Sequence, residues 1–168
     1  DPKLWDDVAK EAILKLSTTI SIHLEAPDLA ILANAFARMK HHHPDLFDQI
    51  AFSAQLIIGS FQPQNLAILA NAFGKMDYSH PELFETIALK SLPIISDFKP
   101  QELANLLSGF ARIGAAGKEV SNLFSATKDW LKQNRGLLSR WEERNLVELM
   151  YAFLKARKTD LKLLELVG

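Results

Sequence analysis

The chain of 168 residues contains no cysteine, which excludes a disulfide scaffold and every site that depends on a thiolate. No apolar run approaches the roughly 18 residues that a helix needs to cross a bilayer, so we expect no insertion in a membrane. Hydrophobic residues still make up 48% of the chain, enough to bury a sizeable core. The sequence therefore predicts a folded protein that is stabilised by packing.

Recognisable catalytic motifs are also missing. The sequence has no glycine-rich phosphate loop, no His-Glu-x-x-His pair and no serine in a nucleophile turn. Three histidines gather at 41–43, with His23 and His80 elsewhere, but no set of carboxylates or histidines at ligand spacing supports a metal site. A solvated loop explains the run better than a metal site does. We therefore expect no enzymatic activity, no metal, no cofactor and no small-molecule substrate.

What the sequence does contain is a string that returns at a fixed period. The segment at 29–36, Leu-Ala-Ile-Leu-Ala-Asn-Ala-Phe, recurs almost unchanged at 66–73 and in weaker form at 103–110, each time after 37 residues. A fourth, more divergent copy lies at 146–153, 43 residues after the third. Self-similarity at a period of this length indicates stacked supersecondary units.

Each repeat reads as two helices. In the first helix, apolar residues follow the i, i+3, i+4, i+7 spacing of an amphipathic helix, as in 29–36. The second helix opens on His-Pro at 43–44 and 80–81, with an acid beside the proline, which suits a helix N-terminus. Residues 2–9 carry the same motif, so we expect the chain to begin with a helix that corresponds to the second helix of a repeat. Pro93 should bend or end the helix in which it lies.

Two further features of the repeats concern packing. A large apolar residue precedes each repeated string by five residues and is expected to anchor the entry of the first helix, at Leu24, Phe61, Phe98 and Trp141. Small residues recur on one face of the first helices, where we expect the next helix to approach closely: Ala30, Ala35, Ala37, Ala67, Ala72, Gly74, Ala104, Gly109 and Ala111. Enlarging one of them should overpack that contact.

The sequence therefore predicts an all-α fold, a right-handed α-solenoid of stacked helix-turn-helix repeats of about 37 residues. We expect a single array over 1–168. It consists of a helix at 2–20, repeats at 27–61, 63–98 and 100–138, and a partial repeat at 142–167 with a terminal segment at 160–167. Because the chain starts at Asp1, halfway through a repeat, we expect it to be a fragment of a longer or processed chain.

One face of the first helices lies off the packing positions, at the spacing i, i+4, i+7, i+11. In all four copies this stripe ends on a cation, and its third position is Asn, Asn, Ser and Tyr. Phosphate neutralisation with one set of base contacts per unit is what a reader of single-stranded RNA needs. The candidate RNA-binding residues on the stripe are Asn34, Arg38, Gln64, Asn71, Lys75, Gln101, Asn105, Ser108, Arg112, Arg144, Tyr151 and Lys155.

Other interpretations of the stripe stay open. A lysine or arginine near a helix C-terminus is favoured by the helix dipole alone, by about 0.3–1 kcal/mol. Asn34 and Asn71 could form hydrogen bonds between neighbouring helices. Ile31 and Ile68, at the second position, could be packing residues, which would bury part of the stripe.

Charge is distributed unevenly along the chain. Residues 1–111 hold 8 Lys+Arg and 13 Asp+Glu, a net charge of −5, whereas residues 112–162 hold 11 and 6, a net charge of +5. The C-terminal third is therefore the better candidate to face a polyanion, although ordinary helical surfaces also show imbalances of this size. The candidate RNA-binding residues in this basic third are Lys128, Lys132, Arg135 and Arg140.

A longer motif combines these features. It runs Pro-Gln-x-Leu-Ala at 63–67, Ala-Phe at 72–73 and His-Pro-Glu-Leu-Phe at 80–84, and its opening returns at 100–104. In this motif the chain resembles the octotricopeptide and heptatricopeptide repeat families of organellar proteins, which often carry a C-terminal RAP domain. The period of 37 residues fits the heptatricopeptide version better. The fourth copy departs, because no Pro-Gln precedes Leu146, and no RAP domain is visible.

The resemblance implies a nucleus-encoded RNA-binding protein of mitochondria or, alternatively, of plastids. Such proteins stabilise, process or help translate organellar transcripts, and some become structural parts of mitochondrial ribosomes. We therefore expect an organellar RNA-binding protein that is a component of the mitochondrial ribosome or a factor associated with it. Its expected partners are a single-stranded transcript or rRNA and other proteins of a ribonucleoprotein assembly. The alternative is a protein–protein scaffold with no direct RNA contact.

Overall fold

The computed structural model describes residues 1–18 and 25–158, and within these ranges the chain is helical with short connections and no strand. This confirms the all-α prediction for the part described. None of these helices is long and apolar enough to cross a membrane. Leu24, His23 and the terminal segment at 160–167 lie outside the described residues. The elements are α1 Pro2–Thr18, α2 Ala26–Met39, α3 Pro44–Leu56, η1 Ile58–Ser60, α4 Pro63–Lys75, α5 Pro81–Ser91, η2 Leu92–Asp97, α6 Pro100–Arg112, α7 Lys118–Gln133, α8 Arg135–Leu138 and α9 Glu143–Lys155.

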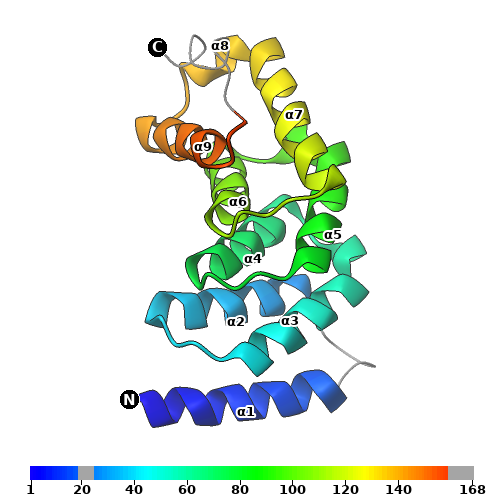
Figure 1. The fold of residues 1–168 in the computed structure, drawn as a ribbon, viewed down its shortest axis with the longest axis vertical. Helices are drawn as coiled ribbons and strands as arrows, with labels where there is room; N and C mark the ends of the chain where they lie inside the picture. The colour runs from blue at the N-terminus through cyan, green and yellow to red at the C-terminus, as the bar shows by residue number, and fades with distance from the viewer. Residues whose placement is uncertain (19–24, 159–168) are drawn as a thin grey trace.

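The longer helices form two rows (Figure 1). The A helices are α2, α4, α6 and α9; α4 packs between α2 and α6, and α6 in turn packs against α9. The B helices are α1, α3, α5 and α7, and they pair in the same order. Figure 1 shows the A helices on the left and α3, α5 and α7 on the right, with α1 at the bottom and α8 at the top. Helices that neighbour each other within a row therefore come from successive repeats.

Aromatic side chains connect the two rows. The phenylalanine that ends each repeated string is 0% exposed in all four copies. Each of these rings meets the edge or face of an aromatic ring from the preceding B helix, the geometry that aromatic quadrupoles favour. The pairs and their centroid distances are Trp5–Phe36 at 5.1 Å, Phe47–Phe73 at 4.9 Å, Phe84–Phe110 at 4.8 Å and Phe124–Phe153 at 5.4 Å. One aromatic contact thus fixes each B helix against the A helix that follows.

The predicted anchors and small residues also belong to the packed interior. Phe61 and Phe98 are 1% and 4% exposed, and Trp141 is partly buried against the core. The small positions on the A helices are buried, with Ala35 intermediate. At the crossing of α4 and α6, a Cβ built on Gly74 would lie 2.7 Å from Cα of Gly109, too close for a real contact. The prediction of close approach is confirmed at this pair.

The repeated histidines start the B helices. Nδ1 of His43 accepts a hydrogen bond from the backbone N–H of Leu46 at 3.3 Å, and His80 caps α5 in the same way through Leu83, also at 3.3 Å. The proline that follows each histidine needs no partner for an N–H. His41 forms a hydrogen bond with Asp6 of α1, in which Nε2 of His41 lies 2.8 Å from Oδ1 of Asp6. The expectation of a simple solvated loop at 41–43 was therefore wrong for two of its three histidines.

Each A helix ends in the same backbone conformation. The left-handed residues are Lys40, Asp77, Gly114 and Arg157, with φ between 52° and 63°. In each case the next N–H donates to the carbonyl of the buried phenylalanine, at 2.9–3.1 Å, as in a Schellman motif. Only the third copy uses glycine, so the sequence carried no signal for this cap.

Lys40→Gly is expected to raise the free energy of unfolding by about 0.5–1 kcal/mol, because glycine adopts a positive φ without the clash of a Cβ. At the equivalent position of the third repeat, Gly114→Ala should lower it by a similar amount, although the added Cβ would meet nothing within 4 Å. Urea denaturation of both variants measures the difference. Changes of the same sign would contradict a common left-handed cap.

Candidate nucleic-acid interface

The predicted stripe lies on the A helices, and burial divides it into two classes. Exposed candidates are Arg38, Gln64, Lys75, Gln101, Arg144, Tyr151 and Lys155, whereas Asn34, Asn105 and Arg112 are half-buried. Asn71 and Ser108 are only 8% and 0% exposed. Ile31 is 63% exposed and is therefore not a packing residue, while Ile68 is half-buried. The stripe therefore has a regular spacing in the sequence, but its side chains do not form a continuous exposed surface.

Arg112 connects three A helices at the middle of the stripe. Its Nη1 donates to Oδ1 of Asn71 on α4 at 3.2 Å, and its Nη2 lies 3.7 Å from Oε1 of Glu148 on α9. Nearby, the Ser108 hydroxyl donates to the backbone carbonyl of Glu148 at 3.5 Å. Asn71 therefore forms a hydrogen bond between neighbouring helices, which is one of the alternatives to RNA binding that the sequence left open. The carboxylate of Glu148 also offsets the charge of Arg112, which makes this cation a weak candidate for phosphate.

Between the N-terminal halves of α4 and α6, the stripe opens into a groove of about 280 Å³, lined by Gln64, Ala67, Ile68, Lys99, Gln101, Glu102 and Asn105. The structure thus brings together three carboxamides that the sequence assigned to two repeats. A carboxamide both donates and accepts hydrogen bonds, which is the chemistry that reads a base edge. We call this hollow the α4–α6 groove.

Lys99 is a lining residue that the sequence analysis missed. It precedes the first turn of α6, so it stands outside the helical spacing that defined the stripe. Its side chain is 80% exposed, and Nζ lies 3.9 Å from Oε1 of Glu102. A solvated pair at this distance leaves the ammonium accessible to a ligand. In the sequence, the only indication that Lys99 contributes to the site was that a cation directly precedes Pro100.

The exposed stripe cations Arg38, Lys75 and Lys155 lie in the last turns of α2, α4 and α9. In the part of the chain that the structure describes, none of the three has an ion-pair partner. Their placement satisfies the helix dipole and also leaves their charge available to an anion. Geometry alone is compatible with both roles.

The basic C-terminal third lies elsewhere. Lys128 and Lys132 are one turn apart on the B helix α7, Arg135 begins α8, and Arg140 follows α8. Figure 1 shows α8 at the top of the molecule and α7 running down from there towards α5, whereas α4 lies lower, next to α2. The structure therefore does not gather these four cations with the stripe. Lys128 and Lys132 are half-buried, and Arg135 and Arg140 are exposed.

Metal-ligating side chains do not cluster in the part of the chain that the structure describes. In 1–18 and 25–158, no group of three His, Cys, Asp or Glu side chains could hold a metal ion. Burial raises the pKa of Tyr78 to about 12, and the hydrogen bond that its hydroxyl donates to Asp48 at 2.9 Å adds to this effect. A tyrosine held protonated in this way ties the turn after α4 to α3, which is a structural role.

Comparison with known proteins names a family. The profile of the RNA-editing substrate-binding complex 6 protein family, RESC6, matches residues 3–168. No curated protein matches the chain. The profile is not that of an octotricopeptide or heptatricopeptide family, so the finer assignment suggested by the repeat motif stays a prediction. Because the match extends over nearly every residue, the chain belongs to the family of RNA-editing substrate-binding complex 6 proteins.

Proposed function

We propose that this protein is a non-enzymatic, RNA-contacting subunit of a mitochondrial complex that binds the substrates of RNA editing. The family name supplies the complex and its substrate, and the resemblance to organellar repeat proteins supports the compartment. Nothing in the family favours the mitochondrial ribosome or a plastid, the more specific expectation and its alternative. We propose further that the two rows form a right-handed α-solenoid of the octotricopeptide or heptatricopeptide kind.

The α4–α6 groove is the observation that carries this proposal. Gln64, Gln101 and Asn105 line it from two successive repeats, and Lys99 stands at its edge. A single strand that runs along the A helices could place an unpaired base in the groove next to Lys99. Phosphates of nucleotides further along the same strand would then lie beside Lys75 and Arg38, because Lys75 is about 16 Å from Gln64 along α4. Carboxamides would then read the base edge, while the cations would position the backbone.

Few phosphate contacts imply weak binding by the isolated protein. Each contact with single-stranded RNA contributes about 0.7 to the slope of log K against log salt, and the chain has a net charge of −1. Other subunits of the complex would raise the effective affinity by binding the same RNA or by holding this subunit near it.

A second candidate function is a protein–protein scaffold without RNA contact. Three large apolar side chains on the B helices favour it: Phe52, Leu56 and Leu89 are 50%, 57% and 59% exposed. Phe52 and Leu56 are one turn apart on α3, so their exposed side chains are neighbours, and contiguous apolar surface is typical of sites that other proteins cover. A subunit can use one row for RNA and the other for protein, so the decisive question is whether the A helices touch RNA.

Charge reversal on the A helices tests this question. We expect Arg38→Glu with Lys75→Glu to weaken binding of single-stranded RNA at least about tenfold and to lower the salt slope by about 1.4. Arg112 is left out because its substitution would also break the contacts with Asn71 and Glu148. Fluorescence anisotropy over a salt series measures both quantities.

Lys3→Glu with Lys10→Glu on α1 is the matched control, because it changes the net charge equally at two exposed cations outside the A helices. If the control weakens binding as much, the effect is one of net charge alone. Unchanged binding by the A-helix variant, with helicity intact by circular dichroism, would assign Arg38 and Lys75 to helix capping and favour the scaffold.

A further inference from the structure

Exposed apolar side chains form a line across three B helices. Phe52 and Leu89 occupy the same position in α3 and α5, 37 residues apart, and they are 50% and 59% exposed. One turn after Phe52, Leu56 corresponds to Leu14 of α1 when both helices are counted from their first proline, and both are 57% exposed. Because α1, α3 and α5 pack side by side in this order (Figure 1), the four side chains lie on one surface.

Carboxylates border this line on one side. On each of α3 and α5, acids stand four and seven residues before the exposed apolar residue, at Asp45, Asp48, Glu82 and Glu85. These spacings place the acids on the same face of the helix as the apolar side chain, one and two turns nearer its N-terminus. We call the apolar line and these four acids together the B face.

Two of the acids are held in place by neutral groups. Asp48 accepts a hydrogen bond from the hydroxyl of Tyr78 at 2.9 Å, and Glu85 accepts one from the backbone N–H of Glu119 at 3.0 Å. A neutral donor leaves the net charge of the carboxylate unchanged, so both positions remain negative. The structure therefore fixes negative charge at the same place in two successive repeats.

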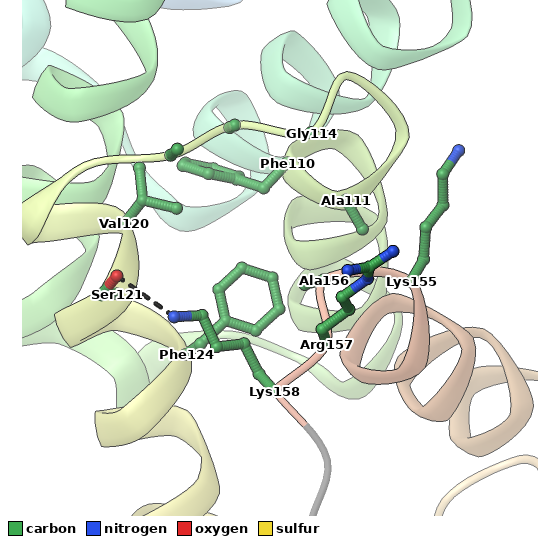
Figure 2. Close-up of a pocket in the computed structure, with 12 residues that line it drawn as sticks. Phe110, Ala111, Gly114, Val120, Ser121, Phe124, Lys155, Ala156, Arg157 and Lys158 are labelled. Carbon is green, nitrogen blue, oxygen red and sulfur yellow. Dashed lines mark hydrogen bonds between the residues drawn. The ribbon is translucent and has the colours of Figure 1, made fainter.

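No lysine or arginine among the described residues forms an ion pair with these acids. Nδ1 of His80 lies 3.6 Å from Glu82, but it already accepts a backbone hydrogen bond and is therefore unprotonated. Lys90 of α5 donates from Nζ to the backbone carbonyl of Gly59 at 2.9 Å instead. Figure 2 shows three exposed cations at the end of α9, which belongs to the A row: Lys155, Arg157 and Lys158. Positive charge on the B face must therefore come from a partner.

We propose that the B face binds a basic amphipathic helix of another protein, lying across α1, α3 and α5. Neighbouring packed helices are about 8–10 Å apart, and seven residues of an α-helix rise about 10.5 Å. Apolar residues of the partner at seven-residue spacing would therefore meet one B helix each. Lysine or arginine residues on one flank of the partner would face the four acids.

Charge decides between this occupant and others. Carboxylates repel the phosphates of RNA and of anionic lipids, whereas they attract a cationic helix. Regularly spaced apolar anchors are also the means by which an amphipathic helix is recognised in other complexes. The inference does not depend on whether the A helices bind RNA.

The probe is a synthetic peptide that a covalent staple holds helical, because a free helix of this length is marginal in water. It carries leucines at seven-residue spacing, lysines along one flank and a fluorescent label. Fluorescence anisotropy should detect binding that weakens several-fold as salt rises from about 50 to 300 mM, because salt screens exposed charges. The same peptide with glutamates in place of the lysines should not bind.

Two variants separate the apolar contact from the charged one. Phe52→Ser with Leu89→Ser should weaken peptide binding at least about tenfold, because two apolar anchors are lost. Asp45→Asn with Glu82→Gln should weaken it about threefold and remove most of its salt dependence. The other two acids are left unchanged, because their hydrogen bonds join successive repeats.

Val147→Ser with Leu154→Ser is the matched control. These side chains on the A helix α9 are 68% and 55% exposed, so the change removes exposed apolar surface away from the B face. Peptide binding should be unchanged, and circular dichroism should show that every variant keeps its helicity.

Several outcomes would overturn the inference. If the lysine peptide does not bind, or binds Phe52→Ser with Leu89→Ser as tightly as the unmodified protein, the B face is not its site. Equal binding of the glutamate peptide would exclude a basic partner. If sedimentation shows self-association that Phe52→Ser with Leu89→Ser abolishes, the occupant is a second copy. A single-stranded RNA oligonucleotide keeps the two proposals apart, because RNA binding without peptide binding refutes only this inference, and the reverse refutes only the proposed function.

Discussion

Gly109→Ala should lower the free energy of unfolding by about 2 kcal/mol or more. A Cβ at this position would meet the backbone carbonyl of Ala70 and would lie 2.8 Å from the backbone nitrogen of Asn71. Backbone atoms cannot rotate away, so α4 and α6 must separate. Alanine gains about 1 kcal/mol of helix propensity over glycine, but overpacking costs about 1–3 kcal/mol and sometimes more, so the steric effect should win.

Urea denaturation measures the loss, and Gly136→Ala is the control. A Cβ on Gly136 in α8 would meet nothing within 4 Å, so this substitution should be neutral or slightly stabilising. The same stability for both variants would contradict the close crossing of α4 and α6. Because Gly109→Ala separates the helices that form the α4–α6 groove, it should also weaken RNA binding.

Phe73→Ala should be the more damaging change, with a loss of about 3–5 kcal/mol. The ring is 0% exposed and contacts three other aromatic rings: its centroid lies 4.9 Å from that of Phe47, 6.0 Å from Tyr78 and 6.4 Å from Phe84. Truncation leaves a cavity between the rows that the neighbouring helices can fill only in part.

Phe52→Ala makes the same chemical change on the B helix α3, where the ring is 50% exposed. We expect its cost to stay below about 1 kcal/mol, because little apolar surface leaves a buried site. Differential scanning calorimetry of the pair should show a much larger drop in Tm for Phe73→Ala. Equal drops would mean that the aromatic contacts between rows do not hold the fold together.

Local chemistry determined the helices themselves. Apolar residues at 3.6-residue spacing and prolines at the first helical position located α4 at Pro63 and α6 at Pro100. The prediction that Pro93 ends its helix is also confirmed, because α5 stops at Ser91 and the chain continues as the 3-10 helix η2. These features depend on residues within one or two turns of each other, so the sequence displays them directly.

The candidate interface depended on more distant residues. Asn71 and Ser108 occupy the same position in their helices as Asn34, yet Asn34 is half-buried while the other two are buried. Their burial and hydrogen bonds come from the next A helix, through Arg112 and Glu148, about 40 residues further along the chain. Helical spacing predicts which face a side chain occupies but not what the neighbouring helix covers.

The sequence by itself therefore determined the period, the helices and the polar face of the A helices. Only the tertiary structure decided which polar side chains on that face bond between helices and which remain free for a ligand. It also created the α4–α6 groove, which is lined by residues from two successive repeats. The physical reason is that exposure and partner choice are set by packing between helices, which no single helix encodes.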